Sequence, residues 1–230
     1  MNTPPEFDRY ADSYDAALAE GLSVSGEDKH YFARGRVEWL KRCLRAEGAR
    51  ARTVMDYGCG TGTSVRLLLE LPGAEHVCGV DVSPKSLERA RETHVNTRAS
   101  FYLIEDYQPT RAFDLVFSNG TFHHIAPEAR AASVDYVRDS LHMGGLFALW
   151  ENNPLNPATR YVMSRCPFDE DAIMLTAGEA RALLRGRGFE IISTSYLFIF
   201  PRLLRHLRFI EPHVARLPLG TQYQILCRKV

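Results

Sequence analysis

The sequence predicts an α/β fold in which a mostly parallel sheet carries helices on both faces. Short β-branched or apolar runs alternate with helical patterns along most of the 230 residues. A glycine-rich turn follows the first apolar run directly, as it does where a buried strand feeds a helix. The composition, 45% hydrophobic and 24% charged, is typical of a folded globular protein. We found no internal repeat or linker, so we expect a single domain over residues 1–230.

Seven segments have the length and composition of strands. They are residues 53–57, 76–81, 100–104, 113–118, 145–151, 189–200 and 222–228. Helical patterns fill the gaps, over 65–71, 83–95, 127–143 and 176–184. Ser83 followed by Pro84 predicts a helix start, and Thr176 with Glu179 matches a capping box. Right-handed crossovers would place these helices on both faces of the sheet.

Two regions fall outside this alternation. Residues 1–50 have helical patterns at 10–19 and 29–47 and precede the first strand, so we expect an N-terminal helical cap. Residues 152–175 are rich in Asn and Pro and interrupt a strand-to-helix step. In open α/β sheets the ligand crevice lies beyond the carboxyl ends of the strands. We therefore expect 152–175 to form a lid over a substrate.

Composition excludes several classes of protein. Lys+Arg and Asp+Glu both total 28, so the whole-chain cationic field that favours nucleic acid is absent. The five cysteines are spaced singly, which argues against a disulfide framework or a cysteine zinc cluster and favours a reducing compartment. The apolar runs are too short to span a membrane, and the first residues lack a secretory leader pattern. We expect a cytoplasmic monomer or homodimer without a membrane or nucleic-acid partner.

The strongest local signal is the turn at residues 58–62, where three glycines alternate with other residues. Glycine permits a sharp turn and the close approach of a ligand, and the helix that follows offers free N–H groups. The spacing G-x-G-x-G differs from the dinucleotide spacing G-x-G-x-x-G, which disfavours an oxidoreductase. Asp56, Asp81 and Asp106 each lie at the carboxyl end of a predicted strand. A carboxylate there can hold an amino group or both hydroxyls of a ribose.

These residues resemble the class I S-adenosylmethionine-dependent methyltransferases, of the type that modifies quinones and natural products. Residues 56–62 resemble their first motif, 80–83 their acidic ribose-binding loop, 113–119 their strand-four motif and 141–149 their Gly-Gly step into strand five. The resemblance covers roughly residues 7–151. It implies a Rossmann-like sheet of seven strands in the order 3-2-1-4-5-7-6, with the last strand antiparallel.

The resemblance also implies a cofactor site for S-adenosyl-L-methionine, with S-adenosyl-L-homocysteine as the product. The aspartates and glycines surround the methionine part and the ribose, an aromatic residue of the N-terminal helix covers the cofactor, and Arg36 pairs with its carboxylate. For Tyr14, which follows Tyr10 at helical spacing, ordinary helix packing stays an equal alternative. The residues expected at the cofactor are Tyr14, Arg36, Asp56, Gly58, Gly60, Asp81, Val82, Asp106, Tyr107 and Asn119.

The acceptor side is expected at the carboxyl ends of strands four and five. His123 and His124 follow strand four and are candidate proton acceptors, although such a pair can also simply shape the pocket. Glu151 is a candidate base or substrate ligand, and Asn152 is a candidate substrate contact. Arg160, together with Arg165, could bind an anionic substrate group or lie on a solvated helix face. Tyr161 of the same helical stretch is a further candidate substrate contact. We expect no metal, because no further ligand stands near the histidine pair at metal-ligand spacing.

The sequence thus predicts an enzyme that transfers a methyl group to an O, N or C atom of a small molecule, such as a secondary metabolite, a sugar or a quinone-like ring. The alternatives are an RNA or protein methyltransferase and a non-catalytic protein that only binds the cofactor. A further open point is the basic and apolar segment 201–216, which could lie on acidic lipid or cover the sheet between strands six and seven.

Overall fold

The structure is a computed structural model that describes residues 21–230. Its centre is a seven-stranded sheet in the order β3-β2-β1-β4-β5-β7-β6. The strands are β1 (Thr53–Tyr57), β2 (His76–Asp81), β3 (Ala99–Leu103), β4 (Phe113–Asn119), β5 (Leu141–Asn152), β6 (Phe189–Leu197) and β7 (Gln222–Lys229). β7 runs antiparallel to both of its neighbours, and β1 to β5 pair in parallel. The predicted strand order and the antiparallel last strand are confirmed.

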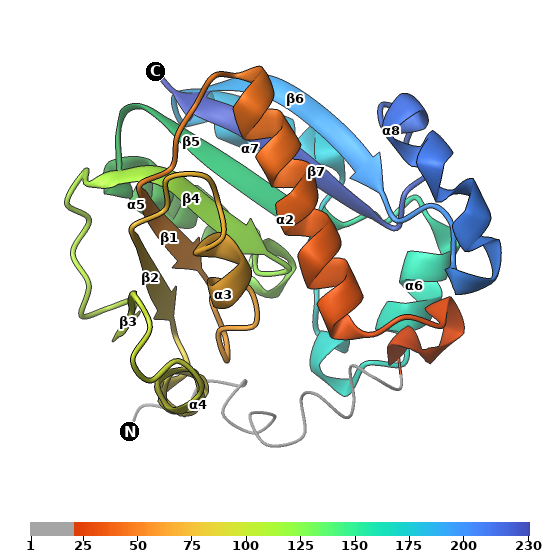
Figure 1. Ribbon diagram of the computed structural model, residues 1–230, viewed down its shortest axis with the longest axis horizontal. Coiled ribbons are helices and arrows are strands. Elements are labelled where there is room, and N and C mark those ends of the chain that lie inside the picture. Colours follow the sequence, from red (N-terminus) through yellow and green to blue (C-terminus); the bar gives the residue numbers. More distant parts are fainter. Residues whose placement is uncertain (1–20) are drawn as a thin grey trace.

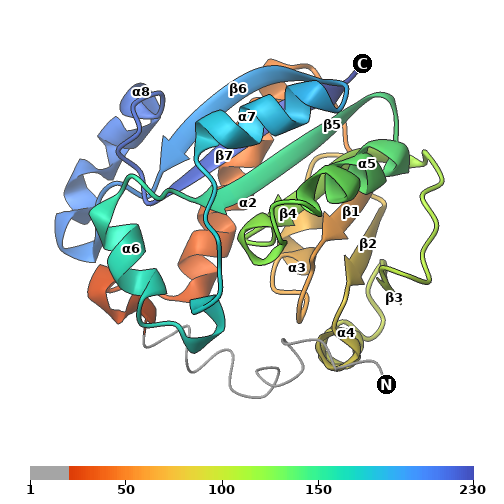
Figure 2. The ribbon, with the colours of Figure 1, turned by 180° about the vertical axis from the view of Figure 1, so that it is seen from behind.

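Helices cover both faces of this sheet. The α-helices are α2 (Lys29–Ala46), α3 (Val65–Leu68), α4 (Pro84–Thr93), α5 (Arg130–Ser140), α6 (Pro157–Met163), α7 (Ala177–Gly186) and α8 (Glu211–Val214). The 3-10 helices are η2 (Ser23–Ser25), η3 (Phe122–His124), η4 (Pro167–Asp169) and η5 (Arg202–Ile210). Figure 1 shows α2 and α3 in front of the sheet, and the reverse view in Figure 2 shows α5 and α7 on the other face. Each face has its own hydrophobic core.

Polar side chains fix where the helices start. The Asp28 carboxylate accepts a hydrogen bond from the backbone N–H of Tyr31 and caps α2. Ser83 caps α4 in the same way, with Pro84 in the first turn. The predicted capping box of Thr176 and Glu179 is present at the start of α7. Each of these three capped helices therefore begins within one residue of its predicted start.

Two strand boundaries differ from the prediction by more than one residue. β5 begins at Leu141, four residues early, because Leu141 is buried and pairs with Phe113 before an irregular stretch brings the main ladder into register. β6 ends at Leu197 instead of residue 200, because Phe198 has a left-handed backbone conformation with φ of +63°. That turn directs the chain away from the sheet and toward the cavity described below.

The segment 201–216 does not cover the sheet between β6 and β7, which was one of its two alternatives. η5 and α8 lie beyond the end of β6, and η5 lies beside η2 and the start of α2 (Figure 1). Arg208 of η5 pairs with Glu27 at 3.0 Å between Nη2 and Oε1. Within residues 21–230, none of the helices is long and apolar enough to cross a bilayer.

Candidate functional site

A cavity of about 680 Å³ opens at the carboxyl ends of the parallel strands. One side is formed by the glycine turn after β1 and the loop after β2. The opposite side is formed by η3, α6 and η4, and residues 198–201 close it from the direction of β6. Segments far apart in the sequence thus meet where the topology of the sheet predicts a ligand.

The glycine turn bends in a way that other residues adopt rarely. Gly58, Gly60 and Gly62 have φ values of +73°, +52° and +79°. A Cβ on Gly58 would clash with the Thr121 side chain, so this glycine permits close packing of the turn on the loop after β4. A Cβ on Gly60 would meet nothing within 4 Å, and Gly60 lines the cavity. The turn therefore presents bare backbone to a ligand at Gly60.

Asp81, at the end of β2, is held against that turn. Its Oδ2 accepts a hydrogen bond from the Gly60 N–H at 2.8 Å, and its Oδ1 accepts one from the Ser83 N–H at 2.9 Å. A carboxylate oxygen can accept more than one hydrogen bond. Asp81 lines the cavity with both oxygens fixed in direction, as recognition of a ribose would require.

Asp56 and Arg36 bring opposite charges to the same wall. Both side chains are buried and both line the cavity. Burial, together with the negative charge of Asp81, raises the pKa of Asp56 to about 7, and the nearby Arg36 guanidinium opposes this rise. Arg36 Nη1 also donates to Gln222 Oε1 of β7 at 3.0 Å. A ligand that carries both an ammonium and a carboxylate would match this pair.

The other residues predicted at the cofactor divide into two groups. Val82 and Asn119 line the cavity. Asp106 is exposed and Tyr107 packs its ring against Phe113, so neither is among the lining residues; from the same region it is Ile104 that reaches the cavity. Contact of Asp106 and Tyr107 with an adenine stays a prediction. Tyr14 lies outside the described residues.

The acceptor side is organised around a buried histidine–carboxylate pair. His123 Nδ1 lies 2.6 Å from Glu151 Oε2, and Glu151 Oε1 accepts the backbone N–H of Phe122 at 2.7 Å. Burial alone would lower the pKa of His123, but the charge of Glu151 and the carboxylate of Asp169 outweigh it and raise the pKa to about 10. Glu151 is not among the residues that line the cavity, and it is linked to the cavity by its contact with His123.

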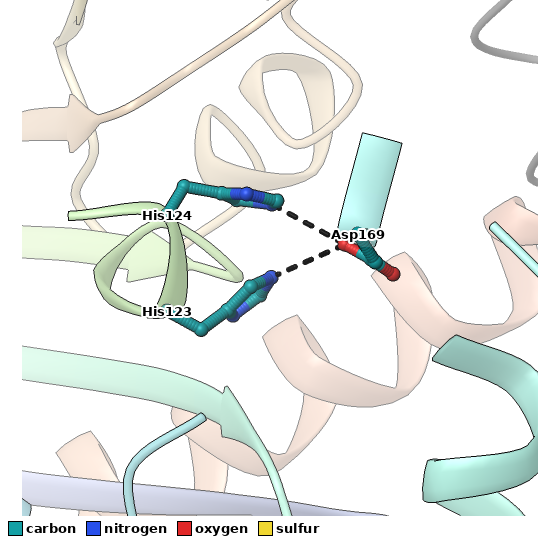
Figure 3. A group of neighbouring side chains, drawn as sticks. All are labelled: His123, His124 and Asp169. Atoms are coloured by element: carbon teal, nitrogen blue, oxygen red, sulfur yellow. Dashed lines mark ion pairs between the residues drawn. The ribbon is translucent and has the colours of Figure 1, made fainter. Parts of the chain in front are cut away.

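Asp169 of η4 joins this pair from the segment that we predicted as a lid. Its Oδ1 lies 3.6 Å from His123 Nε2 and 3.4 Å from His124 Nε2. Dashed lines in Figure 3 mark these two ion pairs. Burial and the charge of His123 lower the pKa of His124 to about 4, so His124 is uncharged at neutral pH. The sequence did not single out Asp169, because its proximity to the histidines arises only from the path of 152–175.

The three remaining acceptor candidates lie differently. Asn152 lines the cavity and accepts a hydrogen bond from Gln222. Arg160 and Tyr161 are exposed on α6 and are not among the residues that line the cavity. α6 lines it with Ala158, Thr159, Val162 and Met163. For Arg160 and Tyr161 the structure therefore corresponds to the solvated-face alternative.

An aromatic wall that the sequence did not predict closes the cavity. Phe198, Tyr31 and Phe32 line it, with ring centroids of Phe32 and Phe198 4.9 Å apart. Arg208 lies over the Tyr31 ring at 4.5 Å. The signal for this wall was the apolar run at 196–200, which reads equally well as the end of a strand.

Known proteins resemble this chain in both sequence and architecture. Residues 54–145 match the family described as a methyltransferase domain. That stretch contains the glycine turn, Asp81 and the histidine pair. Residues 54–145 thus carry the sequence pattern of a methyltransferase domain. The predicted class I fold of S-adenosylmethionine-dependent methyltransferases is thereby confirmed, and this class implies S-adenosylmethionine as the cofactor.

Curated relatives of this methyltransferase domain include the ribosomal protein L11 methyltransferase of Paraburkholderia phytofirmans, 36% identical over 103 residues that span 44% of this chain and 32% of the relative. The tRNA U34 carboxymethyltransferase of Shewanella pealeana is 37% identical over 127 residues, covering 48% and 36% of the two chains. The chain thus spans about a third of the length of these relatives.

Solved structures agree with the domain over nearly its whole length. An S-adenosylmethionine-dependent methyltransferase from Thermotoga maritima has a TM-score of 0.65 at 18% identity, covering 97% of this chain and 98% of its own. One from Mesorhizobium loti has a TM-score of 0.60 at 23% identity, covering 84% and 98%. At these identities the likeness establishes the fold.

Proposed function

We propose that this protein transfers the methyl group of S-adenosylmethionine to a small-molecule acceptor. The observation that carries the proposal is that the glycine turn with Asp81 and the His123 cluster line one continuous cavity. S-adenosylmethionine supplies a methyl group on a positively charged sulfur. Methyl transfer needs the two reactants aligned in one enclosed space, and this cavity offers both sides of it.

On the donor side, each part of the cofactor has a matching group. Asp56 would hold the ammonium and Arg36 the carboxylate of the amino-acid part, because both are buried at the same wall. Gly60 has no side chain, so the cofactor can approach the backbone of the turn closely. Asp81 would bind the ribose hydroxyls. Asn119 and Val82 complete this side.

On the acceptor side, His123 and His124 would orient the nucleophile. His123 holds its proton strongly between two carboxylates, so at neutral pH it is suited to donate a hydrogen bond rather than to accept a proton. His124, which is uncharged at neutral pH, can accept a hydrogen bond from a hydroxyl or an amine. Glu151 fixes the ring of His123 and is a positioning residue.

A small acceptor is favoured by the enclosure of the cavity. Phe198 and Met163 make its walls apolar, and α6 and η4 stand across it. Drug-sized ligands occupy clefts of roughly 300–1,000 Å³ that are mostly apolar with a few placed polar groups. Among the charged residues that line the cavity, Arg208 of η5 is paired with Glu27.

The test is calorimetric binding of S-adenosylhomocysteine, with NAD as the competing ligand, followed by turnover of isotope-labelled S-adenosylmethionine with acceptor panels. One panel holds amines, phenols and sugars, and the others hold tRNA and ribosomal proteins, the acceptors named for the curated relatives. We expect binding of the donor product but not of NAD, and methylation within the small-molecule panel. Failure to bind the donor product at millimolar concentration overturns the proposal, and methylation only of tRNA or protein overturns the acceptor class.

A further inference from the structure

The side chains of His123, His124 and Asp169 place three metal-ligating atoms around one point. The two Nε2 atoms and the Asp169 oxygen all lie within 4.8 Å of one another. Two ligands of a tetrahedral ion with bonds of about 2.1 Å stand about 3.4 Å apart. The two histidine–aspartate distances, 3.6 and 3.4 Å, are close to that separation.

The donor set selects a class of ion. Two imidazole nitrogens and one carboxylate oxygen suit first-row divalent transition metals such as Zn²⁺, Co²⁺ and Fe²⁺. Mg²⁺ and Ca²⁺ prefer sites made of oxygen alone. Figure 3 shows the imidazole rings, on consecutive residues of η3, both directed at the Asp169 carboxylate of η4.

The surroundings of His123 are those of a metal ligand. A ligating histidine normally donates its other ring N–H to a carboxylate, which fixes the ring and its tautomer. Glu151 Oε2 lies 2.6 Å from His123 Nδ1, which leaves Nε2 to face Asp169. Glu151 is fixed in turn by the Phe122 backbone N–H. The pair therefore supplies a ligand together with the outer carboxylate that orients it.

The site is open on one side. All three ligand residues line the cavity, and the exposed fractions of the His124 and Asp169 side chains are 16% and 7%. An ion held by three protein ligands keeps a coordination position for a further oxygen or nitrogen. That position would face the space beside the glycine turn where the acceptor would lie.

We propose that His123, His124 and Asp169 bind one divalent transition-metal ion at the acceptor side of the cavity, with Glu151 as the outer carboxylate. The ion would take the place of the proton that His123 Nε2 otherwise holds toward Asp169. It would hold the acceptor by an oxygen or nitrogen atom and would tie η4 to η3. Because Asp169 comes from the segment 152–175, the ion would also fix that segment over the cavity. Binding of the ion needs neither cofactor nor acceptor, so it can be tested apart from methyl transfer.

The experiment measures ion binding to the untagged chain after treatment with a chelator. Zn²⁺ is titrated by calorimetry, and Co²⁺ by its visible absorption, which reports nitrogen and oxygen ligands directly. We expect one ion per chain, with Zn²⁺ affinity reduced at least 10-fold in both His124→Ala and Asp169→Asn. Glu151→Gln, which keeps the shape of the side chain, should weaken binding by about 10–100-fold.

The matched control is His142→Ala. His142 is an exposed histidine that also faces a carboxylate, with its Nε2 2.9 Å from Asp114 Oδ1, and it is not among the residues lining the cavity. This variant should bind Zn²⁺ like the unchanged chain. Equal Zn²⁺ affinity in the unchanged chain, His124→Ala and Asp169→Asn overturns the proposal, provided that circular dichroism shows all of them folded. Loss of binding in His142→Ala alone would overturn it as well.

Discussion

The backbone N–H of Gly60 donates to Asp81 Oδ2 across 2.8 Å and joins the turn after β1 to the end of β2. The carboxylate is thereby aimed into the cavity before any ligand arrives. A preset hydrogen-bonding group loses little freedom when the ligand binds, which favours affinity.

Replacement of Asp81 by Ala should weaken donor binding. A hydrogen bond to a charged group contributes about 1.5–3 kcal/mol, which corresponds to roughly a 10- to 150-fold rise in the Kd of S-adenosylhomocysteine. Calorimetry at fixed pH measures it. Asp106→Ala is the comparison, because Asp106 is exposed and is not among the lining residues. Equal losses in the two variants would contradict the placement of the ribose at Asp81.

Donor affinity should depend on pH through Asp56. The pKa of its carboxyl is raised to about 7 by burial and by Asp81, and an adjacent ammonium group would favour the ionised form. Binding of S-adenosylhomocysteine should therefore release protons near pH 7, and affinity should fall as the pH drops from 8 to 6. Calorimetry in buffers of different ionisation enthalpy counts the protons. Asp56→Asn should lose this dependence; if it persists there, another group is responsible.

The same shift predicts a change in stability. The folded pKa of Asp56 lies above the ordinary value of 3.8, so folding takes up a proton between these two values. The contribution of Asp56 therefore makes the fold less stable as the pH rises from about 4 to 7. Asp56→Asn should be less sensitive to that rise in thermal unfolding, measured on the chain without ligand. A steeper decline than in the unchanged chain would contradict the assignment.

Glu151→Ala should destabilise the fold strongly. It removes the acceptor of two buried donors, His123 and the Phe122 N–H, and breaking a buried pair costs about 3–5 kcal/mol. Denaturant unfolding measures the change. The exposed pair of His142 and Asp114 provides the contrast, since His142→Ala should cost about 1 kcal/mol or less. Similar losses at the two sites would mean that the buried pair carries no special stability.

Gly35→Ala should disturb the aromatic wall. A Cβ at Gly35 would lie 2.6 Å from Phe198 Cε1, and the Phe198 ring is already packed against Phe32 and Trp150. Overpacking of this kind costs about 1–3 kcal/mol. Gly186→Ala, at the end of α7 with nothing within 4 Å, should be neutral or slightly stabilising. The free energy of unfolding is measured for both variants. If Gly35→Ala is as stable as the unchanged chain, the Phe198 ring is free to move.

The donor half of the site could be predicted from the sequence because its parts are local. Gly58, Gly60 and Asp81 lie at or just beyond the carboxyl end of a strand, so the strand order alone brings them together. Tyr107 shows where this reasoning stops. Whether a residue after a strand faces the ligand or the core depends on the conformation of a single turn. The ring of Tyr107 packs on Phe113.

The acceptor half could not be predicted in the same way. Asp169 reaches the histidines only through the path of α6 and η4. On α6, burial of Met163 and Thr159 turns Arg160 and Tyr161 outward, a choice of helix face that short polar segments do not specify. The aromatic wall depends on the left-handed backbone conformation of Phe198. The sequence carries no signal for that conformation at a residue other than glycine.

The segment 152–175 has a consequence for how such a protein can be altered. It joins β5 to α7 and contributes Asp169 and Met163 to the cavity, whereas the glycine turn and Asp81 belong to a different part of the sequence. It is therefore an exchangeable cassette: transplanting the corresponding stretch of another methyltransferase between β5 and α7 should redirect the choice of acceptor while leaving the grip on the donor intact.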